Sequence, residues 1–301
     1  MTDLDQTVLA GPSGPNATVT LESTPGGRGK HLATQVLKRP TVLVSALILL
    51  VVLLAAVWPS LFAGTDPFAT SPKDILVPPG SPGFPMGSDA VGRDLFSRVV
   101  HGARPSLEAA GMAILVSFLG GALLGLLAGY FGGFVDAVIM RVVDVVLAFP
   151  ALLLAMAIVA VLGAGPINVA AAVGVVGIAS MARVMRSEVV RVRRELFVEA
   201  AGLSGAHWWT VLLRHVLPNS LGPIVVLAAL ELGTSILSIS SLSFLGMGAP
   251  PPSPEWGALI SDGRNYLVSA WWLSAFPGLV VALVVLAANR IARALDGELK
   301  A

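Results

Sequence analysis

Long apolar stretches separated by short polar segments are the feature that most constrains how this chain can fold. We identify six of them, at residues 41–57, 106–129, 137–162, 169–181, 221–245 and 271–288. About 20 apolar residues cross the hydrocarbon core of a bilayer as a helix, and about 17 is near the lower limit. Only 12% of the residues are charged, against about 25% in soluble domains. The sequence therefore predicts an all-α polytopic membrane protein with about six transmembrane helices.

The distribution of basic residues predicts how the chain is oriented. Cytoplasmic segments of membrane proteins carry an excess of lysine and arginine. Basic residues precede the first apolar stretch and follow the last one: Lys30, Lys38, Arg39, Arg290, Arg293 and Lys300. We therefore expect a multi-pass protein of the bacterial cytoplasmic (inner) membrane with both termini in the cytoplasm. Three arginines in the predicted outer segment, Arg93, Arg98 and Arg104, oppose this tendency.

The composition outside the apolar stretches divides the chain further. The first 30 residues are rich in glycine, proline, serine and threonine and lack periodicity, which is typical of disorder. Prolines crowd the stretch after residue 58, which indicates a loop. The predicted organisation is a disordered cytoplasmic tail (1–30), an N-terminal transmembrane helix (31–58), an extracytoplasmic segment (59–104), a core domain (105–295) and a cytoplasmic C-terminal tail (296–301).

Residues 183–218 form the one long polar, helix-forming segment between apolar stretches, and six of them are arginines. Glu199, Ala200 and Ala201 favour a helix, whereas Gly205 permits a tight turn. A second short helix is expected at residues 208–215, ending before Pro218, which can only start the next helix. An exposed helix with aromatic side chains suits a groove on another protein. The alternative is a basic helix resting on anionic lipid headgroups.

Three motifs resemble one family. Glu199-Ala200-Ala201, Gly205 and His215-Val216-Leu217-Pro218 have the spacing of the EAA loop of ABC-importer permeases, and a histidine at 215 resembles the peptide branch. The stretch around Gly92-Arg93-Asp94 and the loop at residues 244–257 are similar to the same branch. The chain thus resembles the C-type membrane permease subunit of a dipeptide/oligopeptide or nickel ABC importer, in the binding-protein-dependent transport inner-membrane component family.

This resemblance implies a type I ABC importer permease fold and a transport subunit rather than an enzyme. It implies a homologous second permease subunit, two ABC ATPase subunits or domains, an extracytoplasmic substrate-binding protein and a lipid bilayer as partners, and no nucleic acid. ATP and Mg would lie on the ATPase partners, with no cofactor in this chain. The residues implied in coupling to the ATPase are Glu199, Ala200, Ala201, Gly205, His215, Leu217 and Pro218. The expected cargo is di- or oligopeptides, with nickel or another small solute as the alternative.

Glu231 is the one acidic residue deep within an apolar stretch, and hydroxyl residues follow it. A carboxylate at that depth is costly and usually faces protein or a water-filled path. We therefore treat Glu231, Ser235, Ser238 and Ser241 as candidates for the translocation path. The alternatives are a structural contact of the glutamate with a partner subunit and serine hydroxyls that only bond back to their own helix.

Other functional classes find little support in the sequence. Gly202-Leu203-Ser204-Gly205 matches the GxSG pattern of rhomboid intramembrane proteases, but that chemistry needs a histidine base within reach, and none of the four histidines lies in a predicted span. The chain has no cysteine and no clustered metal-ligand pattern, so we expect no catalytic and no metal-binding residue. A homo-oligomeric channel would need a repeated filter or a ring of charges.

Overall fold

The computed structural model describes residues 40–299, with side chains described as far as residue 294. The predicted tail at residues 1–30 and the end of the predicted C-terminal tail lie outside this range. The described part of the chain forms helices and loops without a β-strand. The helices are α2 Pro40–Val57, α3 Leu95–Phe131, α4 Gly133–Ala148, α5 Ala151–Leu162, α6 Pro166–Val192, α7 Leu196–Leu203, α8 Trp208–Val211, α9 Leu217–Phe244, α10 Trp256–Gly263 and α11 Trp272–Leu299.

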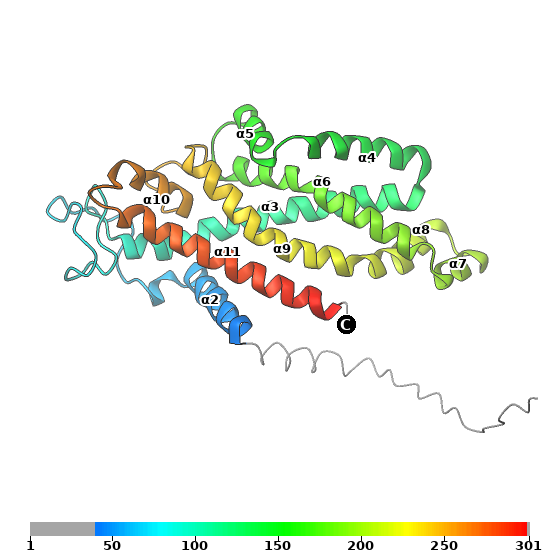
Figure 1. Ribbon diagram of the computed structural model, residues 1–301, viewed down its shortest axis with the longest axis horizontal. Coiled ribbons are helices and arrows are strands. Elements are labelled where there is room, and N and C mark those ends of the chain that lie inside the picture. Colours follow the sequence, from blue (N-terminus) through cyan, green and yellow to red (C-terminus); the bar gives the residue numbers. More distant parts are fainter. Residues whose placement is uncertain (1–39, 300–301) are drawn as a thin grey trace, which may run out of the picture.

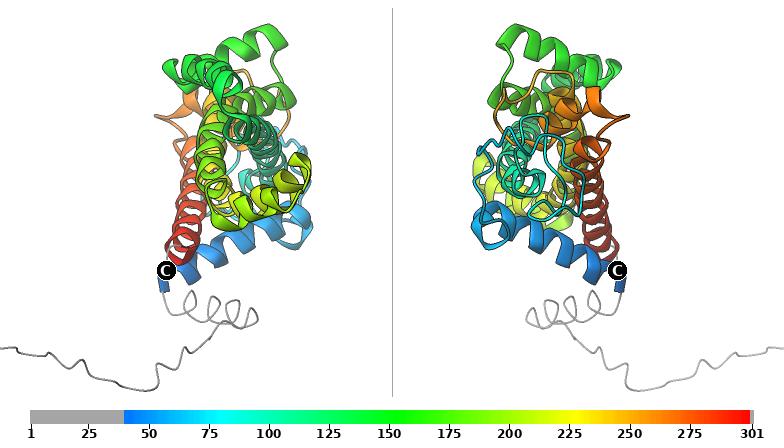
Figure 2. Two further views of the ribbon diagram at one scale, coloured as in Figure 1. Left: turned by 90° about the vertical axis from the view of Figure 1, so that its right-hand side faces the viewer. Right: turned by 90° about the vertical axis from the view of Figure 1, so that its left-hand side faces the viewer.

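The long helices α3, α6, α9 and α11 run along the long axis of the molecule (Figure 1). The outer loop at residues 59–94 and α10 lie at one end of this bundle, whereas α7 and α8 lie at the other. The two end-on views show α2 on one side of the bundle and α4 with α5 on the opposite side (Figure 2). α2 packs against α11 and α3, and α4 packs against α3 and α6.

Five helices are long and apolar enough to cross a membrane, and α4 with α5 would make a sixth span if the bent pair is counted as one. The break lies at Phe149 and Pro150, where the two helices meet at 98°. The sequence predicts a span at residues 137–162 with a kink at Phe149-Pro150; the structure confirms the position of the interruption, and the bend is sharper than a kink within one helix. Proline lacks the N–H that continues a helix, and it favours an extended residue before it.

The second span is longer than the sequence predicts. α3 has 37 residues, or about 55 Å at 1.5 Å per residue, and it starts at Leu95 rather than near residue 106. Asp94 caps it by accepting hydrogen bonds from the N–H groups of Phe96 and Ser97. The boundary expected between residues 104 and 105 therefore falls inside one helix. Charged residues interrupt the apolar pattern there, but packing against α10 buries that part of α3.

A row of small residues sets the closest packing in the bundle, between α3 and α6. The sequence has Ser117, Gly121, Gly125 and Gly129 at intervals of four, which predicts a face where helices pack closely, and all four are buried. A Cβ atom placed on Gly121 would lie 2.2 Å from the Cβ of Met181 on α6, so only glycine permits this approach.

Candidate functional sites: a coupling segment and a cavity around Glu231

The turn between α7 and α8 has the geometry that Gly205 predicts. Gly205 has a φ of +84°, a conformation that residues with a Cβ adopt at a cost. Its N–H donates to the carbonyl of Gly202 (3.1 Å), and the N–H of Ala206 donates to the carbonyl of Ala201 (3.3 Å). These two bonds form a Schellman motif, which satisfies carbonyls at the end of a helix. α7 therefore ends in a sharply defined turn.

The second short helix is not a separate unit. α8 continues into a π-helix, η2 Leu212–Val216, and from there into α9 without a break. Pro218 lies in the first turn of α9, as the sequence predicts, but no break separates α9 from the preceding helix. The N–H of Leu217 donates to the carbonyl of Leu212, five residues back, and this wider turn relieves the crowding that a proline ring causes in an α-helix. α8, η2 and α9 therefore form one continuous helical segment.

The seven residues expected to couple to an ATPase fall into two groups. Glu199 and Ala200 are exposed on α7 and Ala201 is half-buried there; Gly205 forms the turn. His215, Leu217 and Pro218 belong to the junction between η2 and α9. His215 and Leu217 are half-buried and Pro218 is exposed. Glu199 and Ala200 therefore lie at the free surface, whereas Ala201 and Leu217 pack against a buried apolar cluster at this end of the bundle.

Tyr130, at the end of α3, anchors the segment. Its hydroxyl donates to the carbonyl of Trp208 (2.9 Å). Its own carbonyl accepts a hydrogen bond from Arg193, whose guanidinium lies 5.5 Å from the centre of the Tyr130 ring. Val198 on α7 and Val211 on α8 are buried in a cluster that includes Met185 of α6. Because these contacts join α7 and α8 to α3 and α6, the segment is fixed relative to two long helices.

Large apolar side chains remain exposed on the outer side of this segment. The exposed fraction is 81% for Leu196, 84% for Leu203, 57% for Trp208 and 53% for Trp209. Several large apolar side chains exposed on two neighbouring short helices indicate an interaction site. We call this surface, formed by α7 and α8, the α7–α8 surface.

Glu231 lies on α9 and points between α3 and α6. Its carboxylate accepts hydrogen bonds from the hydroxyl of Ser180 on α6 (2.6 Å) and the hydroxyl of Ser117 on α3 (3.3 Å). Ser235, Ser238 and Glu231 line a cavity of about 230 Å³, which α5 and the end of α4 cover from the side. The structure therefore brings together three of the four residues that the sequence singles out.

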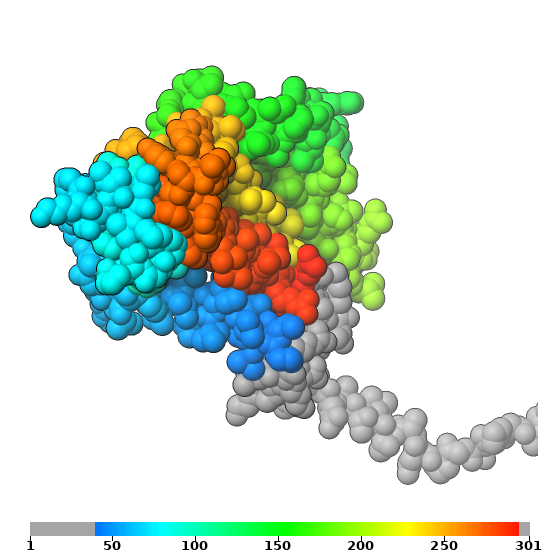
Figure 3. Space-filling model, turned by 60° about the vertical axis from the view of Figure 1, so that its left-hand side comes forward, coloured from blue at the N-terminus to red at the C-terminus, as the bar shows by residue number. Residues whose placement is uncertain are grey.

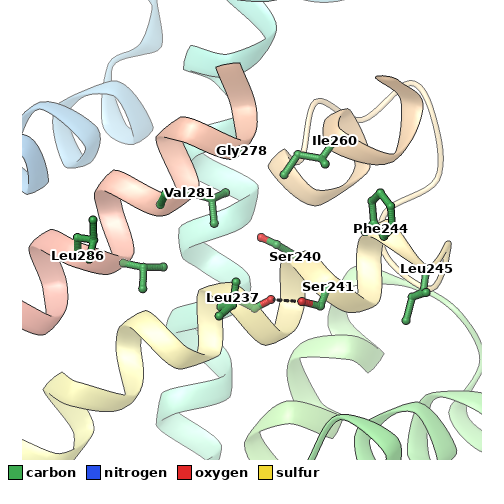
Figure 4. Close-up of a pocket in the computed structure, with 11 residues that line it drawn as sticks. Leu237, Ser240, Ser241, Phe244, Leu245, Ile260, Gly278, Val281 and Leu286 are labelled. Carbon is green, nitrogen blue, oxygen red and sulfur yellow. Dashed lines mark hydrogen bonds between the residues drawn. The ribbon is translucent and has the colours of Figure 1, made fainter. Parts of the chain in front are cut away.

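Ser241 belongs to a different cavity. It lines a space of about 640 Å³ between α9, α10 and α11, whose other lining residues are almost all apolar (Figure 4). Its hydroxyl donates to the carbonyl of Leu237, one turn earlier (2.8 Å). This is the local bonding expected of a serine without a pathway role, and it separates Ser241 from the cavity around Glu231.

At the other end of the bundle, a buried ionic cluster holds the outer loop to α3. The side chain of Arg98 is 1% exposed and its Nη1 contacts Asp89 at 2.5 Å. Arg93 pairs with the same carboxylate at 2.6 Å, while Arg104 pairs with Glu108 at 2.8 Å. The three arginines that oppose the charge rule are therefore all paired. Sequence analysis missed this cluster, although the acidic residues in the same loop were a signal for it.

Hydrogen bonds and charge determine the protonation of the acids in this cluster. Burial raises the pKa of Asp89, but N–H donors from Arg93 and Val91 and the charges of Arg93 and Arg98 outweigh burial, so the net pKa is lower than usual. Burial raises the pKa of Asp262, on α10. It also raises the pKa of Glu255, which caps α10 by accepting from the N–H groups of two residues that follow it.

The outer loop and α10 form one continuous surface at this end, as the space-filling view shows in cyan and orange (Figure 3). Trp256 joins α10 to α3, since its indole N–H donates to the carbonyl of Val99 (2.9 Å). Within residues 40–299, no group of three or more His, Cys, Asp or Glu side chains could hold a metal ion.

The fold is that of membrane-embedded transport subunits. A chain of the inward-facing MetNI methionine ABC transporter matches with a TM-score of 0.51 and 18% identity, over 66% of this chain and 96% of that one. A chain of an amino acid ABC transporter matches with a TM-score of 0.52 and 13% identity, over 68% and 94%. These likenesses establish the type I ABC importer permease fold.

The chain belongs to the family of binding-protein-dependent transport system inner membrane components, which matches residues 121–301. The dipeptide transport system permease protein DppC of Alkalihalophilus pseudofirmus is 40% identical over 270 residues, covering 88% of both chains. The probable D,D-dipeptide transport system permease protein DdpC of Escherichia coli is 39% identical over 87% of both. The glutathione transport system permease protein GsiD of Pectobacterium atrosepticum is 45% identical over 71% of this chain and 73% of its own length.

These relatives confirm that the chain is the permease subunit of an ABC importer and a multi-pass inner membrane protein. They do not favour the homo-oligomeric channel. The relatives are transport permeases, in keeping with a transport subunit rather than an enzyme.

Proposed function

We propose that the chain forms half of the translocation pathway of an ATP-driven importer of di- or oligopeptides. The observation that carries this proposal is the 40% identity to a dipeptide permease across 88% of both chains. Relatives named for D,D-dipeptides and for glutathione support the same substrate class, since each is a short peptide. Nickel or another small solute is the alternative that the experiment below decides.

The partners follow from the type of system. A homologous permease completes the pathway, two ABC ATPase subunits or domains bind inside the cell, and an extracytoplasmic binding protein delivers the substrate. ATP and Mg lie on the ATPases, and this chain carries no cofactor. The exposed α7–α8 surface supports ATPase docking, because an exposed helix with apolar and aromatic anchors suits a groove on another protein.

Coupling works through the continuity of α8, η2 and α9. When ATP closes the ATPase pair, the α7–α8 surface moves with its partner as a rigid body. Because α9 follows α8 without a break, that displacement reaches the cavity around Glu231 and contributes to alternating access. In this proposal the α7–α8 end is cytoplasmic, both termini are cytoplasmic, and the loop at residues 59–94 with α10 faces the outside.

Partner content and uptake test the proposal together. The tagged chain, extracted from its native cell in mild detergent, should carry one homologous permease and P-loop ATPases at stoichiometric levels, identified by mass spectrometry. The same complex in proteoliposomes, with its binding protein and ATP, should accumulate labelled Ala-Ala, Ala-Ala-Ala or glutathione. Nickel uptake without peptide uptake would establish the alternative substrate. Recovery of the chain as a homo-oligomer without an ATPase would overturn the proposal.

A further inference from the structure

The cavity around Glu231 contains an acidic group without a cationic partner. Among the residues that the structure describes, the ion pairs involve thirteen other acidic or basic side chains at the bundle ends and along α4 and α6, and Glu231 is in none of them. Its hydrogen bonds come from Ser117 and Ser180 alone. Placing a carboxylate within a membrane helix costs free energy, so such a residue usually marks a functional site.

The two serines leave part of the carboxylate free. An ionised carboxylate has about four acceptor positions, and each hydroxyl supplies one proton. Ser117 and Ser180 therefore fill at most two of the four, because each hydroxyl also lies within hydrogen-bond distance of a carbonyl of its own helix. Ser117 approaches from α3 and Ser180 from α6. The carboxylate also lies against the backbone of Gly177, where an added Cβ atom would be 3.5 Å from Oε2 of Glu231. The remaining acceptor positions are available to a ligand in the cavity.

The rest of the lining fits a donor-rich ligand of limited size. Thr234, Ser235 and Ser238 add hydroxyl oxygens along the same side of α9. The hydroxyl proton of Thr234 is directed to the carbonyl of Glu231 (3.0 Å), so its oxygen faces incoming donors as an acceptor. A volume of about 230 Å³ is below the roughly 300–1,000 Å³ of pockets that enclose whole drug-sized ligands. It accommodates the end of a short peptide rather than its full length.

We propose that this cavity binds the α-ammonium group of the peptide during translocation, with Glu231 as its counter-ion. The inference rests on the proposed peptide import. The α-amino group of a peptide carries a positive charge near neutral pH and offers three N–H donors, in keeping with one carboxylate and several hydroxyl acceptors. A divalent metal is disfavoured, because the described residues supply no second acidic, cysteine or histidine ligand here.

The position of the cavity gives this binding a consequence for transport. Glu231 lies on α9, which continues the helix that starts at the α7–α8 surface, and its two serine partners lie on α3 and α6. The broken pair α4 and α5 supplies the covering wall, with Leu147 and Leu152 both exposed at its rim. Displacement of α9 relative to α3 and α6 would alter the carboxylate's hydrogen bonds and release the ligand.

The test compares ligand binding to the assembled importer in lipid nanodiscs by saturation-transfer NMR. The probes are Ala-Ala and N-acetyl-Ala-Ala, which differ in the charge of the amino end. Glu231→Gln keeps the size of the side chain and removes its charge. We expect it to weaken Ala-Ala binding about tenfold, the effect of one charge-assisted hydrogen bond, and to leave N-acetyl-Ala-Ala unchanged. Glu231→Asp should retain most of the preference for the free amine.

Glu108→Gln is the matched control, because Glu108 is an exposed acid on α3 that pairs with Arg104 far from this cavity. Equal Ala-Ala binding by wild type and Glu231→Gln would overturn the inference. Loss of the second permease from the Glu231→Gln complex would also overturn it, since Glu231 would then be an assembly contact.

If wild type imports peptide while Glu231→Gln binds Ala-Ala normally, only this inference fails. If wild type imports no peptide, the proposed function fails with it.

Discussion

Arg98 shows most clearly how a single residue in this protein depends on its surroundings. Its guanidinium is buried at the outer end of α3, where it holds a loop in place through Asp89. The same arginine donates to the carbonyl of Pro252 (3.4 Å) in the loop before α10. One side chain thus connects the start of α3 both to the loop just before it and to a loop 154 residues further along the chain.

Asp89→Asn should therefore destabilise the protein. Removing one partner of a buried ion pair leaves the other charge uncompensated, which costs about 3 kcal/mol. The measurement is the unfolding of the purified protein in lipid nanodiscs, followed by tryptophan fluorescence. Glu108→Gln makes the same change in an exposed pair and should have no measurable effect. Equal stability of the two variants would show that Asp89 does not support Arg98.

The stabilisation by Asp89 should also depend on pH. Its pKa is lower in the folded protein than in the unfolded chain, so its contribution is complete above the unfolded pKa and is lost as the pH falls through the folded pKa. The stability difference between wild type and Asp89→Asn should be constant between about pH 5 and 8 and shrink below about pH 4. A difference that increases on acidification would contradict this assignment.

Among the helices, α3 and α6 form the pair that depends most on residue size. Gly121→Leu should separate them and destabilise the protein by about 3 kcal/mol, because the new side chain meets Met181 where no space exists. Gly111→Leu is the control, since Gly111 lies on the same helix with nothing within 4 Å of an added Cβ atom. The yield and thermal stability of both variants in nanodiscs test this. Similar behaviour of the two would argue against close packing at Gly121.

The turn at Gly205 should matter for coupling rather than for folding. Gly205→Asp introduces a side chain at a positive φ and a charge beside the α7–α8 surface, with no neighbour within 4 Å to clash. We expect membrane insertion to be normal and ATP-driven uptake to be lost. Gly202→Asp, in the exposed last turn of α7, is the control for the added charge and should retain more activity. Normal uptake by Gly205→Asp would exclude this role.

For the whole molecule, the absence of cysteine from the chain makes orientation directly testable. Ser204 is exposed between α7 and α8, and Val268 is 102% exposed at the opposite end. In intact cells, a membrane-impermeant maleimide should label Val268→Cys and not Ser204→Cys. Both variants should react after the membrane is opened. Labelling of Ser204→Cys in intact cells would reverse the proposed orientation.

The two ends of the molecule are built differently, and this asymmetry fits the proposed direction of transport. One end is a loop-rich cap tied by a buried ionic cluster, and the other exposes apolar side chains on short helices. The cavity around Glu231 is lined by residues of α3, α6 and α9, and these helices extend toward both ends of the bundle (Figure 1).

The sequence by itself determined the class of fold, most of the spans and the turn at Gly205. These depend on local properties: the length of apolar stretches, the conformational freedom of glycine and the spacing of a short motif. The glycine row on α3 was also predicted as a packing face, because small residues at intervals of four line one side of a helix.

Only the tertiary structure decided where polar side chains meet, where helices begin and how sharply they bend. Arg98 and Glu231 each have a partner from a segment distant in sequence, Pro252 and Ser180. The early start of α3, the 98° angle of the break at Pro150 and the continuity of α8 with α9 depend on packing and on alternative hydrogen bonding. The sequence shows which residue types are available for such contacts. Which of these side chains come within hydrogen-bond distance of one another is determined only when the helices pack.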